Sequence, residues 1–571
     1  MSCLKRINRK LSARFGGHVS AREKDCVLYL EGELDRWDDV VAAGLMAVNR
    51  KKYDGLVNDI RFTGDVIPPM RLPRVQDDSL GGATPDVLII GGGIVGCAIA
   101  RECAKYDMRI LLVEKEHDIA MQTTSRNDGM VHPGIDLIPG QIKRRYNMRG
   151  NHMYDQICNE LDVPFLRSGQ YVCFQGKSMA FAAFFGQLYY KLFGPRVQYL
   201  TKREFFLREP NMSPAIHAAL FFPDAGVVSP YGLALAYAEN AVDNGAQVSL
   251  DTAVLDMTVR DGKIVSVQTN RGTIYPKVVV NAAGVFSEDV ARMAQDRFFS
   301  IHPRKGTNTI LDHKASVRMR TIVSSYGTSS TRKRHTKGGG LVKTIDRNTL
   351  VGPDAVETYL KEDYTTNAEN IAFVFEKQQA TDPALHLRDA ITYFSGIRAA
   401  TYEEDFVIRK GKWTRNIVHA AGIQSPGITA APAIAVDVAQ MAAEVLSETR
   451  EVKPNSTFNP IHKSIVRANE LNEAERDALI RENPDYGEIV CRCEQISRGE
   501  VIDALHRCIP CDTLDGVRRR VRPSGGRCQG AFCGPLVLQI IANEAQKPLE
   551  EVGKSGPGGE VLLGSIKEVQ P

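Results

Sequence analysis

The stretch DVLIIGGGIVGCAIARECAKYDMRILLVEKE constrains the fold of this chain more than any other. Four apolar residues, Val87 to Ile90, run straight into Gly91-x-Gly93-x-x-Gly96, and apolar residues at helical spacing follow. This order predicts a buried strand, a tight turn and a helix whose N-terminus holds a pyrophosphate. Gly91 permits the turn, Gly93 lets the backbone approach the phosphates, and Gly96 lets helix and strand pack closely.

A second strand, RILLVE, ends at Glu114. At this position a carboxylate can accept hydrogen bonds from both ribose hydroxyls of a dinucleotide. Strand, helix, second strand and acid follow one another in the required order, so the sequence predicts a dinucleotide site. The alternative, a glycine-rich turn in a plain βαβ unit, leaves Glu114 without a role.

Length and composition narrow the function classes. A chain of 571 residues is too long for one core and predicts three or more units. The 72 Lys and Arg nearly balance the 68 Asp and Glu, and no basic run is interleaved with aromatic residues, so we expect no nucleic-acid partner. No run of about 18 uncharged apolar residues occurs, which predicts no integral membrane segment and a cytoplasmic protein. In that compartment, twelve cysteines indicate metal or redox chemistry.

The predicted fold class is α/β and α+β, with a Rossmann-like dinucleotide-binding domain that contains an inserted antiparallel-sheet substrate domain. The patterns VLYLEGELD, RWDDVVAAGLMAV and GLVNDIRFTG predict a small N-terminal β-α-β unit. Composition places the boundaries at residues 1–80 for this accessory unit, 84–450 for the dinucleotide-binding domain with its insert, 451–485 for a polar linker, 486–545 for a small helical cysteine-rich domain and 546–571 for a tail.

Three separated motifs identify the dinucleotide. They are MQTTSRNDGMVHPGID, GTIYPKVVVNAAGVFSEDVA and NIVHAAGIQSPGITAAPAIA. Together they resemble the D-amino-acid-oxidase-type FAD superfamily, in particular the branch of anaerobic glycerol-3-phosphate dehydrogenase large subunits and L-2-hydroxyglutarate oxidases. The resemblance covers most of residues 84–450 and implies that the cofactor is FAD.

The resemblance also implies which residues contact FAD. Hydroxyls and a guanidinium suit the diphosphate and ribityl chain, small residues suit the adenosine half, and backbone amides suit the isoalloxazine ring. For the diphosphate and ribityl chain, the implied residues are Thr124, Ser125 and Arg126. For the adenosine half they are Val254, Ala283 and Gly284. For the isoalloxazine ring they are Gly422, Gly427, Ile428 and Thr429.

Three side chains are candidates for the substrate pocket. His132 follows the flavin-wrapping segment and is suited to take a hydroxyl proton, although it can instead be a packed histidine that orients the flavin. Arg398 matches the arginine that holds an anionic substrate group in this superfamily, but Ala399 stands where many relatives have proline. Lys305 is a second candidate cation, with a surface lysine as the alternative.

These cations predict a small anionic substrate. The resemblance favours sn-glycerol 3-phosphate, and a 2-hydroxy acid, an amino acid or an opine remain alternatives because arginine binds phosphate and carboxylate alike. From another class, the chain can be an electron-carrying subunit whose active flavin lies elsewhere. That alternative predicts that no substrate reduces its own FAD.

The C-terminal cysteines predict an iron-sulfur site. Cys491-x-Cys493 is followed by 34 residues and then by Cys528-x-x-x-x-Cys533. Four thiolates from two loops are the ligands of a [2Fe-2S] cluster, and a structural zinc ion is the competing interpretation. The spacing and GRCQGAFC resemble a bacterioferritin-associated-ferredoxin-type domain.

Two further cysteines lie between these pairs, and neither is expected to be a ligand. They are Cys508, at the end of the predicted helix VIDALHRC, and Cys511.

Together the two centres predict a dehydrogenase, because a cluster is superfluous if oxygen takes the electrons from flavin directly. The resemblance implies a partner that accepts the electrons, either a flavoprotein or a quinone-linked subunit. The N-terminal unit carries no catalytic motif and resembles a BON-type module only faintly, so we expect an assembly role or an inert extension.

Overall fold

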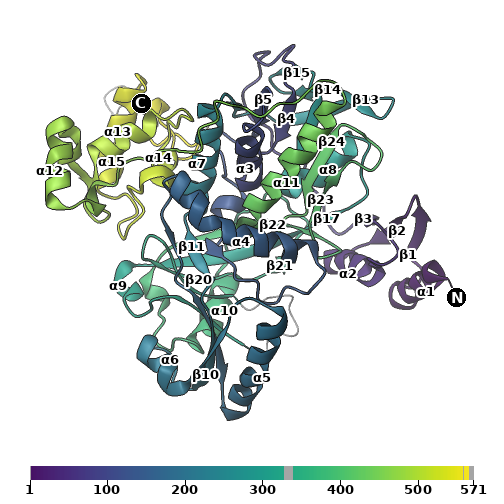
Figure 1. The fold of residues 1–571 in the computed structure, drawn as a ribbon, viewed down its shortest axis with the longest axis horizontal. Helices are drawn as coiled ribbons and strands as arrows, with labels where there is room; N and C mark the ends of the chain where they lie inside the picture. The colour runs from purple at the N-terminus through teal and green to yellow at the C-terminus, as the bar shows by residue number, and fades with distance from the viewer. Residues whose placement is uncertain (1, 327–338, 557, 565–571) are drawn as a thin grey trace, which may run out of the picture.

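The computed structural model describes residues 2–326, 339–556 and 558–564. They form a small N-terminal unit, a parallel sheet with its helices, a large mixed sheet and a helical C-terminal unit (Figure 1). Strands of the large sheet lie in sequence between strands of the parallel sheet, so the two are interleaved. The predicted fold class, a Rossmann-like domain with an inserted sheet, is confirmed.

The N-terminal unit contains a parallel β-α-β arrangement, as its pattern predicts. Its elements are α1 (Cys3–Phe15), β1 (Val19–Lys24), β2 (Val27–Leu34), α2 (Trp37–Ala47) and β3 (Gly55–Phe62). Strands β2 and β3 are parallel, and β1 adds an antiparallel edge. The sequence-based expectation did not include α1, which buries Ile7, Leu11 and Phe15 in the core of this unit.

The parallel sheet has the strand order β12-β5-β4-β16-β24-β23. Its strands are β4 (Val87–Ile90), β5 (Ile110–Val113), β12 (Gln247–Ser249), β16 (Val278–Asn281), β23 (Val407–Lys410) and β24 (Ile417–Ala421). Only β23 is antiparallel to its neighbour. Strands β4 and β5 are apolar and fully buried, as strands covered on both faces must be.

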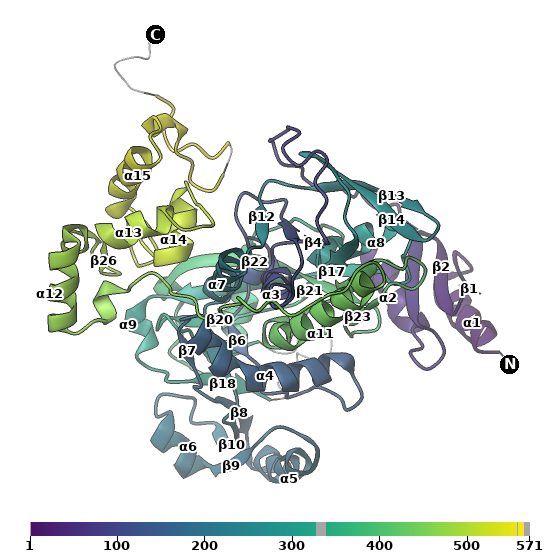
Figure 2. The same ribbon diagram turned by 45° about the horizontal axis from the view of Figure 1, so that its top comes forward.

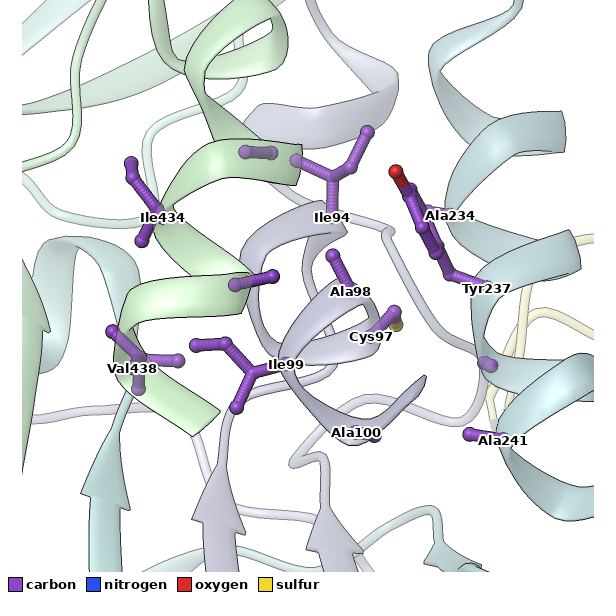
Figure 3. Packing of buried hydrophobic residues seen from close by; sticks show 14 of the residues in the cluster. Ile94, Cys97, Ala98, Ile99, Ala100, Ala234, Tyr237, Ala241, Ile434 and Val438 are labelled. Carbon is purple, nitrogen blue, oxygen red and sulfur yellow. The ribbon is translucent and has the colours of Figure 1, made fainter. Parts of the chain in front are cut away.

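Helix α3 (Ile94–Cys103) lies between α7 (Pro230–Asp243) and α11 (Gly427–Ser447). Figure 3 shows α3 between the two helices, with Tyr237 and Ala241 of α7 turned toward it on one side and α11, which carries Ile434 and Val438, on the other. All four residues belong to the main hydrophobic core. This core fixes the start of α3, and therefore the glycine turn before it.

Helix α11 is long and apolar enough to cross a membrane by length and composition alone. Its most apolar stretch has a mean hydropathy of 1.3, and 67% of that stretch is buried inside the protein. It also contacts α3 and α4 (Ile142–Glu160) extensively. These contacts make α11 a core helix of the fold described here.

The large sheet has the strand order β21-β17-β20-β19-β18-β8-β10-β9, and β22 pairs with β17. Its strands are β8 (Gln170–Gln175), β9 (Gln198–Thr201), β10 (Ile216–Phe222), β17 (Ile301–Leu311), β18 (Ile322–Ser325), β19 (Gly340–Lys343), β20 (Thr349–Gly352), β21 (Val356–Glu357) and β22 (Ala390–Thr401). The pairings are antiparallel except for β18 with β8. The long β17–β22 pair carries Arg304, Lys305 and Arg398, which are discussed below.

Helices cover the large sheet on several sides. Helices α6 (Lys202–Arg208) and α10 (Ala368–Gln379) contribute to one hydrophobic cluster with it, and α5 (Lys177–Phe193) to another. The remaining elements before the C-terminal unit are β6 (Met130–Val131), β7 (Phe165–Leu166), β11 (Gly226–Val228), β13 (Val254–Arg260), β14 (Lys263–Thr269), β15 (Gly272–Ile274), α8 (Ser287–Met293) and α9 (His313–Ser316).

The C-terminal unit is mainly helical. It contains α12 (Glu473–Glu482), β25 (Ile489–Cys491), β26 (Ile496–Ser497), α13 (Arg498–Leu505), α14 (Leu514–Val521) and α15 (Cys533–Glu544). Helix α12 lies within the stretch expected to be a linker and begins with a capping box formed by Asn472 and Glu475. Helix α13 ends at Leu505, so the expectation that Cys508 is helical is wrong.

Buried ion pairs attach the C-terminal unit to the oxidoreductase domain. Arg519 and Arg520 of α14 both donate to the buried carboxylate of Asp118, at 3.0–3.2 Å. Tyr231 of α7 donates to the same carboxylate at 2.9 Å. Burial alone would raise the pKa of Asp118, but the charges of the arginines hold it below its usual value. We call this group of four residues the Asp118 clamp.

Candidate functional site

A pocket lies at the carboxyl ends of the parallel strands, where ligands bind in open α/β sheets. It extends from the turn after β4 to the β17–β22 pair. Of the residues predicted to contact FAD, it is lined by Gly91, Gly93, Glu114, Thr124, Arg126, Val254, Ala283, Gly284, Gly427 and Ile428.

The glycine turn has no room for side chains at two of its positions. Gly91 has φ of +108°, and a Cβ there would lie 2.5 Å from the carbonyl oxygen of Ala282. A Cβ at Gly96 would lie 1.9 Å from the oxygen of Gly91. Gly96 therefore supports the turn from behind instead of lining the pocket, which is the packing role that the sequence predicts.

Glu114 directly follows β5 as a partly enclosed carboxylate that lines the pocket. Its two oxygens accept hydrogen bonds from the backbone amides of Gly92 (2.6 Å) and Glu116 (2.9 Å). Burial nevertheless raises the pKa of Glu114 to about 7. An acceptor for ribose hydroxyls is therefore present, and its charge depends on pH near neutrality.

The segment after Glu114 supplies a hydroxyl and a guanidinium to the pocket. The hydroxyl of Thr124 accepts a hydrogen bond from the amide of Ile94 at 3.0 Å and so caps the start of α3. The Arg126 guanidinium lies 4.2 Å from the ring centre of Tyr364. Ser125 differs from the expectation: it does not line the pocket and its hydroxyl donates to the carbonyl of Ala120.

At the other end of the pocket, α11 begins at Gly427, so its first amide groups point toward the cavity. Gly422 and Thr429 lie just behind the lining. Gly422 has φ of +65° in the turn after β24. The Thr429 hydroxyl accepts a hydrogen bond from the backbone amide of His132 at 2.7 Å, so it positions the segment that carries His132.

His132 and Arg398 both line the pocket. Nδ1 of His132 accepts a hydrogen bond from the amide of Gly134 at 3.0 Å. In the neutral ring the hydrogen is therefore on Nε2. Asp128, which the sequence analysis did not select, also lines the pocket, and burial raises its pKa.

The groups that hold Arg398 in place are uncharged. Both terminal nitrogens donate to the carbonyl oxygen of Asp354 at 3.2 Å. Its guanidinium packs against Gly306, where a Cβ would lie 2.3 Å from one of these nitrogens. Among the described residues, neither Arg398 nor Arg126 has a carboxylate within ion-pair distance. Two half-buried guanidiniums that line a pocket without an ion-pair partner in the described part of the chain fit an anionic ligand.

Lys305 does not join this group. Its ammonium binds Asp363 at 2.7 Å and Thr365 at 3.0 Å, and it does not line the pocket. Arg304, the neighbouring cation on β17, is paired with Glu357 and Glu404. Arg398 is therefore the cation of the β17–β22 pair that remains available to a ligand.

The four predicted cysteine ligands converge from two loops. The sulfurs of Cys491 and Cys493 lie 3.7 Å apart. Cys533 and Cys528 extend this contact on either side, because Cys533 interacts with Cys491 and Cys528 with Cys493.

Backbone amides stabilise negative charge at the same loops. The amides of Phe532 and Gly530 lower the pKa of the Cys528 thiol. Thiolates held by backbone amides are the donor set of an iron-sulfur cluster.

Cys508 and Cys511 belong to a different part of this unit. Cys508 is exposed. Cys511 is buried, and its thiol donates to the carbonyl of Ala504 at 3.4 Å. The expectation that neither is a ligand stays a prediction.

Two family models match the chain. The first, FAD dependent oxidoreductase, covers residues 86–441, and the second, BFD-like [2Fe-2S] binding domain, covers residues 489–543. The first includes every residue lining the pocket except Met70, and the second includes all four converging cysteines. The pocket therefore corresponds to the FAD site, and the cysteine loops to an iron-sulfur site instead of a zinc site.

Individual proteins extend this similarity. The chain is 35% identical to a glycerol 3-phosphate dehydrogenase of Caloramator mitchellensis, over 85% of this chain and all of that protein. It is 25% identical to one of the subunits of the anaerobic glycerol-3-phosphate dehydrogenase of Escherichia coli K12, over 78% and 86% of the two chains. The FAD-bound L-α-glycerophosphate oxidase of Mycoplasma pneumoniae superposes with a TM-score of 0.60 at 26% identity, covering 66% and 98%.

Proposed function

Since this chain belongs to the family of FAD-dependent oxidoreductases, we propose that it oxidises sn-glycerol 3-phosphate to dihydroxyacetone phosphate. Its cofactors are FAD and a [2Fe-2S] cluster. The observation that carries the substrate assignment is Arg398, a cation lining the FAD pocket that has no carboxylate within ion-pair distance among the described residues. The glycerol 3-phosphate relatives support the choice of phosphate over carboxylate.

Arg398 is suited to hold the phosphate. Its contact with the carbonyl of Asp354 and its packing on Gly306 fix the plane of the guanidinium before a ligand arrives. A fixed guanidinium binds two phosphate oxygens at once with little loss of side-chain freedom. The bound phosphate then orients the rest of the substrate within the pocket.

Oxidation of the alcohol removes a hydride from C2 and a proton from its hydroxyl. Bound FAD supplies the two-electron acceptor and the means of releasing electrons one at a time. The chain must supply the acceptor for the proton, and the candidates in the pocket are His132 and Asp128. His132 is the base that the sequence predicts, but as a neutral ring with its hydrogen on Nε2 it acts as a donor at that nitrogen. Asp128 offers a carboxylate with a raised pKa.

Matched variants separate these two roles. If His132 accepts the proton, His132→Asn removes the rise of flavin reduction rate with pH, while Asp128→Asn keeps it. If Asp128 is the acceptor, the outcome is reversed, and His132→Asn lowers the rate at every pH because only a hydrogen-bond donor is lost. General-base removal typically costs about 100- to 10,000-fold in rate.

The substrate is tested by anaerobic mixing of the holoprotein with sn-glycerol 3-phosphate, L-2-hydroxyglutarate, L-lactate or L-proline. We expect glycerol 3-phosphate to bleach the flavin and the paramagnetic signal of the reduced cluster to follow. Bleaching by a hydroxy acid or by proline instead would overturn the substrate and leave the pocket assignment intact. If none of the four bleaches bound FAD, the chain is an electron-carrying subunit.

We further propose that the cluster passes electrons to a partner protein, either a flavoprotein or a quinone-linked subunit. The site of this transfer is the cytoplasm. One relative is itself named as part of a multi-subunit anaerobic dehydrogenase, which supports an assembly with other chains. A substrate-reduced protein that reoxidises slowly in air and rapidly with an added one-electron acceptor would support this route. Fast and complete reaction with oxygen would contradict it.

A further inference from the structure

Helix α5 exposes a continuous apolar surface. Seven large side chains of this helix are 50–68% exposed: Phe181, Phe184, Phe185, Leu188, Tyr189, Leu192 and Phe193. They recur at spacings of three and four residues and so form one stripe. Ala183 alone is fully buried in this helix. We call the seven residues the α5 stripe.

The inner side of α5 is firmly packed. Ala183 and Tyr190 belong to a hydrophobic cluster with Phe174, Leu220 and Phe222 of strands β8 and β10. The Tyr190 and Phe222 rings meet edge to face, with centres 5.1 Å apart. The α5 stripe is therefore presented by a helix that already has its own core contacts.

The charges around the stripe are almost entirely positive. Residues 177–203 contain five Lys and Arg and no Asp or Glu. Lys177 and Lys191 are exposed on the helix itself. Nearby acids are already engaged: Asp224 pairs with Arg196, and Glu204 caps α6. Burial, and after it the charge of Asp136, raise the pKa of Tyr190, so one acid does lie near the inner side of the helix.

A basic hollow adjoins the C-terminal end of the stripe. It is lined by Ile142, Arg144, Arg145, Met148 and Phe193, together with residues 139–141. Arg144 donates to the carbonyl of Phe193, which ties the hollow to the end of α5. Two guanidiniums beside apolar side chains suit the phosphate of a lipid headgroup whose acyl chains lie along the stripe.

The helix lies at an end of the molecule. In both Figure 1 and Figure 2, α5 is at the tip opposite the C-terminal unit, and neither terminal unit covers it. A second copy docked on the same stripe would bring two basic surfaces together at close range, which like-charge repulsion opposes. An anionic surface, in contrast, is attracted to the same charges.

We propose that α5 docks this protein on the surface of a membrane containing anionic phospholipid. The aromatic stripe enters the headgroup region, and the lysines of α5 with Arg144 and Arg145 bind lipid phosphates. A helix with an apolar aromatic face and basic flanks lies in the plane of the interface and does not span it. The C-terminal unit then projects away from the lipid, where a partner has access to the cluster.

Vesicle sedimentation of the holoprotein tests the proposal, using phosphatidylcholine vesicles with and without phosphatidylglycerol. We expect binding that requires phosphatidylglycerol and weakens with salt, because screening reduces attraction to surface charge. The variant Phe181→Ser/Phe185→Ser/Leu192→Ser should bind at least about 30-fold more weakly, since each lost side chain removes apolar burial. The control Val66→Ser/Val317→Ser changes side chains that are 80% and 78% exposed elsewhere and should bind like the wild type.

A second readout does not depend on the stability of the triple variant. In Tyr189→Trp, the new indole should shift to shorter emission wavelength on adding anionic vesicles and be quenched by lipids brominated on their acyl chains. Absence of both effects, or wild-type binding by the triple variant, would overturn the proposal. So would a wild-type dimer that the triple variant converts to a monomer, because the stripe would then join two copies. None of these results depends on the substrate.

Discussion

Glu114 makes FAD affinity depend on pH in a way that the structure quantifies. Burial holds the pKa of this carboxyl at about 7 without ligand, against 4.5 ordinarily. Ribose hydroxyls that donate to the ionised form should bring the pKa of the complex well below 5. Binding then releases a proton at acidic pH. The dissociation constant of FAD should fall about 50-fold from pH 5 to pH 7 and level off above pH 7.

The stability of the apoprotein should change with pH in the opposite direction to FAD affinity, falling as pH rises. Because the pKa of Glu114 is raised in the folded apoprotein, the neutral carboxyl stabilises the fold fully below about pH 4.5, and this contribution disappears as pH rises through about 7. The shift corresponds to about 3 kcal/mol. The melting temperature of the apoprotein should therefore fall from pH 5 to pH 8, while saturating FAD should reduce that fall.

The assay is titration of apoprotein with FAD at several pH values, followed by flavin fluorescence. Glu114→Gln should bind FAD more weakly and with no pH dependence across this range. The neighbouring carboxyl of Glu116 should not contribute to the pH dependence, because its pKa lies near 2 and it stays ionised from pH 5 to pH 8. A wild-type affinity that is flat with pH, or a Glu114→Gln variant that keeps the wild-type slope, would refute the reasoning.

Three further predictions concern the cluster, the core and the substrate. Cys528→Ser should retain FAD but lose iron and the cluster signal, whereas Cys508→Ser should retain both; equal iron loss in the two would contradict the ligand assignment. Gly150→Ala places a Cβ 2.1 Å from the carbonyl of Thr429 and should destabilise the oxidoreductase domain by about 1–3 kcal/mol in thermal unfolding. Gly186 has room for a methyl group and should tolerate alanine, with a gain in stability of about 0.5–1 kcal/mol. If both variants lose stability, the close contact at Gly150 is not the cause. Arg398→Lys should raise KM for glycerol 3-phosphate about 10- to 100-fold with a smaller change in kcat, as loss of one bidentate contact requires; an unchanged KM would remove Arg398 from the phosphate site.

Local patterns in the sequence were sufficient to predict the FAD cradle and the thiol group. The glycine turn, Glu114 and the flanking strands lie within about thirty residues, where spacing alone fixes geometry. The four cysteines also follow from spacing, since each pair sits on one short loop. Helix α1 was predictable as well, because Ile7, Leu11 and Phe15 recur every four residues.

Contacts between distant residues were not predictable in this way. Lys305 is paired with Asp363, almost sixty residues away, and no local pattern connects them. The Asp118 clamp joins residues about 400 positions apart. Asp128 was missed because a lone aspartate after Asn127 is an ordinary turn residue until the pocket around it is known.

The Asp118 clamp has a consequence for the timing of electron transfer. Domains of one chain usually move relative to each other when the interface is small and polar. A carrier domain on a loose tether must swing between donor and acceptor, so its turnover slows as the solvent becomes more viscous. Here a buried carboxylate between two arginines ties the cluster unit to the domain that holds FAD. The tunnelling distance is therefore set when the chain folds, and only the arrival of the external acceptor should respond to viscosity.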